Sequence, residues 1–205
     1  MHSRVARTRR SLHSQNGSHG LTTLELVVSL GIALAISAIA IPSITKTVRV
    51  YQLNDAASQV AGIVKLTRFE AIRRNTPVSC VNSQATANGP ADLWSDSNGD
   101  NVEQGTERQI LLGVNATLVQ EAAVPSAAAL APAVGVPAIT ALNPASDSVR
   151  FDQRGAVTPA GVYVIYVGNN SGADGGYRAV VVLPSGSVQV WTYAGSASAA
   201  WQQLS

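Results

Sequence analysis

The sequence predicts an α+β fold in which one long N-terminal helix packs against an antiparallel β-sheet. Three stretches lead to this prediction: a nearly continuous apolar run over residues 20–42, helical spacing of apolar residues over 43–75, and short β-rich segments over 76–205. About twenty apolar residues are enough for a helix to cross a bilayer. We therefore expect a membrane-spanning half-helix (21–42), an amphipathic half-helix (43–75) and one small domain outside the membrane.

Residues 1–20 precede the apolar run and carry Arg4, Arg7, Arg9 and Arg10 without any acidic residue. Clustered arginines hold a segment in the cytoplasm, so the domain after the helix is expected across the membrane. In an ordinary secretory signal the apolar segment precedes the cut and is removed with it. Here the cut is expected after Gly20, before the apolar segment, which therefore stays on the mature protein.

Glu25 lies inside the apolar run. A carboxylate at membrane depth costs at least a few kcal/mol, so it marks a functional site whose partner is missing. The alternative is a plain signal anchor in which the glutamate has no role. A plain anchor gives no reason for a carboxylate five residues after Gly20, or for Pro42 near the far end of the span.

Gly20, Thr22, Leu24, Glu25 and Pro42 together resemble the class III signal of type IV pilins and pseudopilins. The resemblance implies that a prepilin peptidase cuts after Gly20 and methylates the new N-terminus, Leu21. It also implies that the amine of Leu21 meets Glu25 of a neighbouring subunit. The family usually has Phe where this chain has Leu21. The implied partners are the peptidase, other pilins and an inner-membrane assembly platform.

The helix is expected from about residue 22 to about residue 75, with a bend at Pro42. Arg73 and Arg74 suit the negative end of the helix dipole, and Pro77 marks the exit. One apolar stripe is expected to lie under the sheet. It includes Ile44, Val48, Tyr51, Leu53, Ala56, Val60, Ile63, Val64 and Ile72.

The strand candidates are rich in β-branched and aromatic residues and are separated by Gly, Asn, Asp and Ser. They are residues 78–81, 109–119, 148–151, 162–167, 177–183 and 188–193. A loop is expected over 169–176 and a hairpin turn over 184–186. The Ala- and Pro-rich segment 120–147 is expected to be an extended loop over the sheet, with partner binding as the alternative. Cys80, the only cysteine, is expected to be a small buried apolar residue of a strand.

Several segments resemble the GspH/FimT family. They are residues 66–74 with the strand containing Cys80, the acidic loop from Asp96 to Glu107, residues 149–155, and the 184–186 hairpin. The resemblance implies a pilin fold with a β-rich periplasmic head, and either a type II secretion pseudopilin or a minor pilin of a type IV pilus. Both machines use such subunits, so the choice between them stays open.

Asp96, Asn98, Asp100 and Glu107 fall at places one, three, five and twelve of an EF-hand-like loop. This spacing makes them candidate Ca²⁺ ligands. Asn101 stands where such loops have glycine, and asparagine tolerates the left-handed backbone. The alternative, which we favour, is a solvated acidic turn between strands.

All three histidines, His2, His13 and His19, lie in the leader, so the mature chain has none. This removes imidazole catalysis and histidine metal sites, and we expect no enzyme. The expected function is a structural subunit that waits in the bacterial inner membrane and enters a fibre built on bundled N-terminal helices. A DNA-binding minor pilin is the alternative, although residues 76–205 hold four arginines against nine acidic residues.

Overall fold

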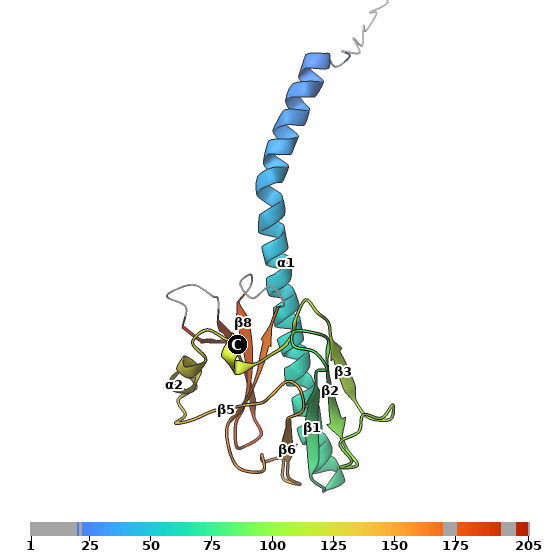
Figure 1. The fold of residues 1–205 in the computed structure, drawn as a ribbon, viewed down its shortest axis with the longest axis vertical. Helices are drawn as coiled ribbons and strands as arrows, with labels where there is room; N and C mark the ends of the chain where they lie inside the picture. Colours follow the sequence, from blue (N-terminus) through green and yellow to red (C-terminus); the bar gives the residue numbers. More distant parts are fainter. Residues whose placement is uncertain (1–19, 21, 170–175, 194–199, 205) are drawn as a thin grey trace, which may run out of the picture. The chain divides into compact units, whose positions relative to one another are not determined.

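The computed structural model describes residues 20, 22–169, 176–193 and 200–204. The chain divides into two compact units, Met1–Ile41 and Pro42–Ser205. A single helix, α1 (Thr23–Arg74), belongs to both (Figure 1). The predicted helix over 22–75 is thus confirmed to within one residue at each end. The loop predicted over 169–176 lies largely outside the described residues.

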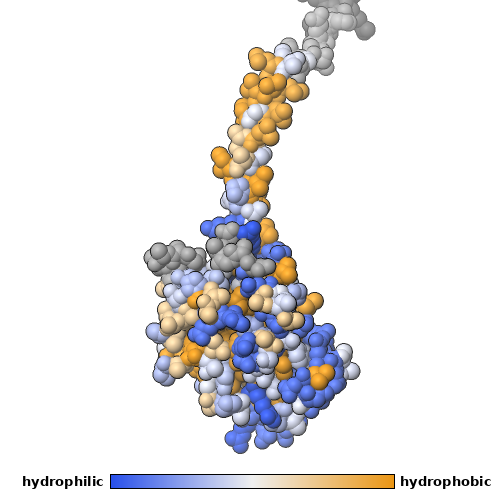
Figure 2. Space-filling view, viewed as in Figure 1, coloured by the Kyte–Doolittle hydropathy of each residue, from blue (hydrophilic) through white to orange (hydrophobic). Residues whose placement is uncertain are grey.

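The part of α1 in the first unit is apolar on all sides. Leu24, Leu30 and Ile39 are 75%, 56% and 78% exposed, and Figure 2 shows mainly hydrophobic residues, with a few paler ones between them, on the visible side of this part of the helix. The helix is long and apolar enough to cross a membrane. A helix that is apolar all round needs an apolar surrounding, either lipid or other helices.

The other end of α1 stops in a hydrogen-bonded cap. Asn75 adopts a left-handed backbone with φ 52°. Its N–H donates to the Ile72 carbonyl at 3.2 Å, and the Thr76 N–H donates to the Ala71 carbonyl at 3.3 Å. This pair of bonds is the Schellman motif, which satisfies carbonyls that have no partner inside the helix. Asparagine can replace the usual glycine there because it tolerates positive φ.

The head contains two sheets, whereas the sequence led us to expect one. The first has the strand order β3-β2-β1-β6, and the second has the order β10-β9-β8-β7-β4, with β5 beside β7. All pairs are antiparallel except β5 with β7, which is parallel. The strands are β1 (Val78–Ser83), β2 (Ala91–Asp96), β3 (Gln109–Leu112), β4 (Thr117–Val119), β5 (Thr140–Ala141), β6 (Ser148–Phe151), β7 (Tyr163–Gly168), β8 (Tyr177–Val182), β9 (Val188–Tyr193) and β10 (Gln202–Leu204).

The expected single strand over 109–119 is wrong. Residues 109–112 form β3 in the first sheet, and residues 117–119 form β4 in the second. The chain turns between them, where the Ala116 N–H donates to the Gly113 carbonyl at 3.4 Å. Glycine and asparagine inside an apolar run are turn signals that the β-rich composition masked. The strands β2, β5 and β10 were missed, because β2 is half polar and the other two are very short.

The main core lies between one face of α1 and both sheets. Leu53, Val60 and Val64 of the helix are fully buried, and they join Leu93 of β2 and Val180 of β8 in one apolar cluster. Cys80 is part of the same cluster at 2% exposure, and burial raises the pKa of its thiol to about 12. The prediction that Cys80 is a buried apolar residue is confirmed.

Part of the predicted apolar stripe does not face this core. Ile44, Val48, Tyr51 and Ile72 are 60%, 46%, 68% and 42% exposed. They lie on faces of α1 that neither sheet covers. Apolar residues three and four apart can belong to more than one face of a long helix, so their spacing alone did not separate the two groups.

The Ala- and Pro-rich segment covers the second sheet on the side away from α1. It contains two 3₁₀ turns, Glu121–Ala123 and Ala127–Ala129, and the short helix α2 (Leu130–Val134). Val124 and the fully buried Leu130 pack with Tyr166, Trp191 and Trp201 in a second cluster. The segment lies over the sheet, but the expected extended loop is wrong, because the chain there is folded into short helical turns.

Three distant segments meet at Arg68. Its Nε–H donates to the Gly155 carbonyl at 2.9 Å, and Gly186 of the β8–β9 turn lies against both groups. Gly155 and Gly186 have φ of 80° and 76°. A Cβ on Gly186 would lie 2.0 Å from the Gly155 carbonyl oxygen and 2.6 Å from Arg68 Nε. The predicted turn over 184–186 is therefore confirmed, and it joins α1 to both sheets.

We expect Gly186→Ala to destabilise the head, because the new methyl group clashes with backbone and the residue must keep a positive φ. The backbone strain alone costs about 1–3 kcal/mol. A melting experiment on the detergent-solubilised protein measures the loss. The matched control is Gly113→Ala, where a Cβ meets no atom within 4 Å. Equal melting temperatures for the two variants would contradict the role of the joint.

Candidate assembly site and head surface

The first turn of α1 is closed by a side-chain cap at Thr22. The Glu25 backbone N–H donates to Thr22 Oγ1 at 3.2 Å, and the Leu26 N–H donates to the Thr22 carbonyl at 3.1 Å. Helices begin with backbone N–H groups that lack partners, and a threonine at this position satisfies one of them. Thr22-Thr-Leu-Glu25 also has the spacing of a capping box. Glu25 therefore stands at a fixed place in the first turn.

The carboxylate of Glu25 is exposed and makes no ion pair with any residue that the structure describes. A negative charge in the first turn of a helix is favoured by the helix dipole. This explains how the helix tolerates Glu25, but not what the carboxylate contacts in an apolar surrounding. The carboxyl group lies beside the exposed side chains of Leu24 and Leu26, and a carboxylate in an apolar surrounding is costly unless a cation lies near it.

The other predicted residues of the N-terminal signal are spread along this segment. Gly20 is exposed just before the cap, and Leu21 lies outside the described residues. Pro42 is inside α1, at the boundary of the two compact units. Its carbonyl accepts a bond from Thr45 Oγ1 at 2.9 Å. The expected bend at Pro42 stays a prediction.

The acidic loop between β2 and β3 folds around two aspartates. Asp96, 2% exposed, accepts the backbone N–H groups of Gly99 at 2.7 Å and Asn101 at 3.1 Å. Asp100 accepts from the Val102 N–H at 2.8 Å and from Gln104 Nε2 at 2.6 Å. Asn101 has φ 57°, the left-handed backbone expected for it. The carboxylates of Asp96 and Asp100 therefore stabilise the loop itself.

Glu107, the fourth candidate Ca²⁺ ligand, lines a different cavity from Asp96. Asp96 lines a cavity of about 370 Å³ with Ser79 and Arg150, whereas Glu107 lines one of about 510 Å³ with Arg73 and Arg108. Among the described residues, no three Asp, Glu, His or Cys side chains converge as a metal site does. Calcium binding stays the less favoured of the two predictions for this loop.

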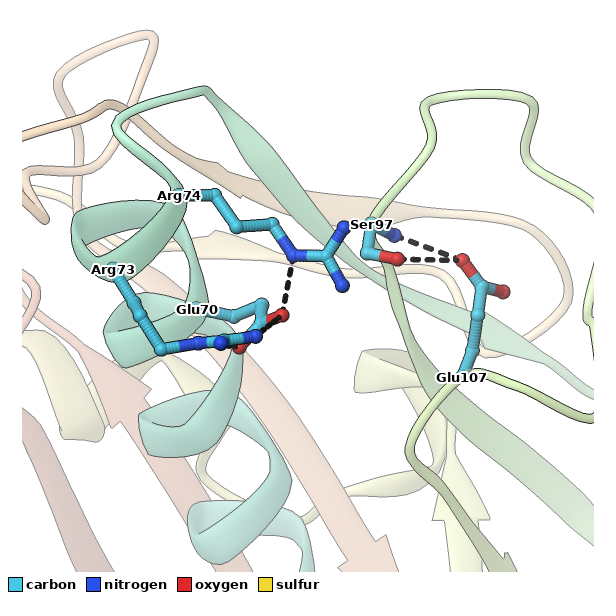
Figure 3. Close-up of polar contacts among 5 residues, drawn as sticks. All are labelled: Glu70, Arg73, Arg74, Ser97 and Glu107. Atoms are coloured by element: carbon cyan, nitrogen blue, oxygen red, sulfur yellow. Dashed lines mark hydrogen bonds and ion pairs between the residues drawn. The ribbon is translucent and has the colours of Figure 1, made fainter.

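The cavity beside Glu107 contains a cluster of charges at the end of α1 (Figure 3). Arg73 binds both oxygens of Glu70, with Nη2 at 2.6 Å from Oε1 and Nε at 3.0 Å from Oε2, and Arg74 Nε binds Oε1 as well. The hydrogen bond from Arg73 is the main cause that lowers the pKa of Glu70 to about 2. Glu107 Oε1 accepts the Ser97 N–H at 2.8 Å, while its buried Oε2 has no partner among the described residues.

One contact between α1 and the second sheet was missed by the sequence analysis. Arg178 of β8 is 3% exposed and donates from Nε to Asn54 Oδ1 of α1 at 2.7 Å. Burial lowers the pKa of its guanidinium. The contact could have been predicted from the arginine inside a run of β-branched residues, because a buried arginine must be hydrogen-bonded.

Comparisons with known proteins found two similar solved structures and one matching family model. Two crystal structures of the type IV minor pilin FimU from Pseudomonas aeruginosa PAO1 resemble it, both with 15% sequence identity and a TM-score of 0.44. They cover 67% and 68% of this chain, and 91% and 88% of their own. A search of curated proteins finds no significant match.

The family model described as "Type II transport protein GspH" matches residues 56–186. That span includes residues 56–74 of α1, the acidic loop and the strands β1 to β8. It is more than half of the chain, so this protein belongs to the GspH family of pilin-like structural subunits.

Proposed function

We propose that this protein is a structural subunit of a pilin-like fibre, cut after Gly20 and held in the fibre by the N-terminal half of α1. The observation that carries the proposal is the capped first turn of an otherwise apolar helix, with Glu25 as its charged side chain. The GspH-family head on the same chain supports it. Together they fit a subunit that leaves the membrane as part of an assembly.

Processing and docking are connected by charge. A cut after Gly20 removes the four arginines of the leader and leaves a positive amine on Leu21, four residues before Glu25. An amine and a carboxylate from two neighbouring helices neutralise each other in an apolar surrounding, where each alone is costly. Such a pair also sets the axial offset between neighbouring helices. The cut therefore creates the partner that Glu25 needs.

DNA binding is not favoured by the head. Of its four arginines, Arg178 is buried against Asn54 and cannot reach phosphates. Arg108, Arg150 and Arg154 are exposed, but the same part of the chain holds nine acidic residues. Affinity for nucleic acid depends on a surplus of lysines and arginines that face phosphates. The structural role is therefore the one we propose.

We expect a clean deletion in the native host to identify the machine. If the subunit primes a type IV pilus, surface pili are lost and exoproteins still reach the medium. If it belongs to a type II secretion pseudopilus, pili remain and exoproteins accumulate in the periplasm. Counting pili and assaying the medium in one strain separates the two, and a strain unchanged in both would contradict a fibre subunit.

Gly20→Leu should leave the leader uncut, because a bulky side chain then stands at the proposed scissile bond. The mass of the membrane-extracted chain is expected to exceed the processed mass by the whole leader of residues 1–20. Gly17→Leu, inside the leader, is the matched control and should be processed normally. Normal processing of the Gly20 variant would disprove the proposed cut.

Glu25→Gln should reduce incorporation into fibres at least about tenfold, because a neutral side chain cannot pair with the Leu21 amine. Membrane insertion should not change. Comparing the variant in sheared fibres and in membranes by immunoblot measures both quantities.

Thr22→Val separates docking from capping, because it removes the cap but keeps the Glu25 carboxylate. We expect Thr22→Val to assemble far better than Glu25→Gln. If both variants fail equally, assembly depends on an intact first turn of α1, and a specific docking role of the Glu25 carboxylate is refuted.

A further inference from the structure

A cavity of about 610 Å³ lies between α1 and the turn that joins β3 to β4. We call it the α1–turn cavity. It is lined by Ile44, Thr45, Val48, Arg49 and Gln52 of the helix, by Val114 and Asn115 of the turn, and by Asn169. All of these residues belong to the second compact unit. Its volume is within the range of sites that hold small molecules.

The charges that line the α1–turn cavity favour an anion. No carboxylate is among the described residues of its lining. By contrast, the cavities beside Asp55, Asp96 and Glu107 each contain at least one carboxylate. Arg49 supplies a guanidinium to the α1–turn cavity, and the exposed Lys46 lies three residues before it on the helix.

Two side-chain amides add neutral hydrogen-bond donors to this cavity. Gln52 lies on the helix after Arg49, and Asn115 lies on the facing turn. Neither amide makes a hydrogen bond with any residue that the structure describes. A guanidinium with amide donors around it suits a group that has several acceptor oxygens, such as a phosphate.

The rest of the lining is apolar, and it lies nearer to the start of the head. Ile44 and Val48 precede Arg49 on the helix and are 60% and 46% exposed. Val114, on the facing turn, is 48% exposed. Along α1 the cavity therefore changes from apolar to cationic in the direction that leads away from the apolar span. A phospholipid changes in the same order from its acyl chains to its phosphate.

The cavity also begins at the depth of lipid headgroups. Ile44 comes three residues after Ile41, where the first compact unit ends, and a helix rises 1.5 Å per residue. The headgroup layer is roughly 5–8 Å thick on each side of the hydrocarbon core. In a subunit anchored through residues 21–42, Ile44 lies among the headgroups. Lys46 and Arg49 are close enough for their long side chains to reach them.

The distribution of charge along the processed chain is unusual for a membrane anchor. Between the proposed cut and Asp55 the charged residues are Glu25, Lys46 and Arg49. Basic residues close to a span are normally concentrated on its cytoplasmic side. Here the cut removes the four cytoplasmic arginines, and two basic residues remain just beyond the other end of the span.

We propose that the α1–turn cavity binds the headgroup of an anionic phospholipid of the surrounding bilayer. The phosphate lies against Arg49 and the two side-chain amides, with Lys46 at its open side. The glycerol and the first acyl carbons lie along the apolar part of the cavity. After the cut, this contact replaces the attraction between the leader's arginines and the membrane. The inference rests on the proposed function, because it needs α1 in a bilayer.

Photolabelling of the full chain in phosphatidylcholine vesicles tests the site. One set of vesicles contains a minor fraction of phosphatidylglycerol that carries a photoactivatable group in its acyl chain, next to the glycerol. The other set carries the same group on phosphatidylcholine. The label is measured by peptide mass spectrometry at residues 111–116, which belong to the head and not to the span. We expect at least about fivefold more label there from phosphatidylglycerol.

The readout is local because the leader's arginines also attract anionic lipid. Lys46→Glu should lower the label from phosphatidylglycerol roughly fivefold. Lys65→Glu is the matched control, since it makes the same charge change at another exposed position of α1, and it should leave the label unchanged. Arg49→Gln should lower the label as well, whereas Arg49→Lys, which keeps the charge, should retain most of it.

Equal label from the two lipids at residues 111–116 would overturn the proposal, and so would equal effects of the Lys46 and Lys65 variants. Suppression of the label by soluble glycerol 3-phosphate would show a site for the free phosphate compound and would overturn the lipid as ligand. Loss of the label whenever other pilin-like subunits share the vesicles would make a neighbouring helix the occupant and overturn it too.

The vesicle experiment is independent of the tests of the proposed function, because it needs neither the peptidase nor a fibre. A failed labelling experiment leaves the fibre role to the Gly20 and Glu25 variants in the native host. Conversely, a deletion without effect on pili or secretion would refute the fibre role while the lipid label remained.

Discussion

The burial of one face of α1 between two sheets is the interaction on which the head depends. Leu53, Val60 and Val64 are fully buried there, and strands from both sheets meet at this face. Among the described residues the strands pair only within each sheet, and the apolar face of the helix packs against both sheets. Arg178 to Asn54 and Arg68 to Gly155 add hydrogen bonds from the helix to each side of this arrangement.

The same arrangement explains why two turns beside α1 need a glycine. Gly155 and Gly186 lie against each other and against Arg68, where no side chain fits. The same turns connect β6 to β7 and β8 to β9, so they hold the strand ends near the helix. The second sheet then needs a cover on its other side. The segment from Val124 to Leu130 supplies it with small apolar residues, which explains its composition.

The two halves of α1 meet different physical demands. In the head the helix buries one face and leaves another exposed, and in the first unit every face is apolar and uncovered. The capped turn at Thr22 and Glu25 begins the part of α1 that packs against no other segment among the described residues. A subunit of this kind is incomplete alone, because both uncovered parts of α1 gain most from contact with lipid or with other subunits.

Local patterns were enough to predict the helix, its ends and most strands. The nearly continuous apolar residues over 20–42 predict a helix without any knowledge of what they contact. Runs of β-branched residues such as that of β8 predict a strand from composition alone. The burial of Cys80 and the turn at Gly186 were also predicted, since each follows from residue type. The family resemblance rested on motifs that are each short and continuous in the sequence, and the family match confirms the resemblance.

Which surfaces face one another could not be predicted from local patterns. Ile44, Tyr51 and Ile72 have the same spacing as the buried residues, but the sheets reach only one face of the helix. Residues 109–119 were predicted to form one strand, but β3 and β4 within this range belong to different sheets. Asp96 and Glu107 fit a ligand spacing, yet they line different cavities. Local conformation was predictable from the amino-acid sequence, because it depends mainly on residues that are neighbours along the chain. Burial and convergence depend on contacts between distant segments, which no local pattern contains.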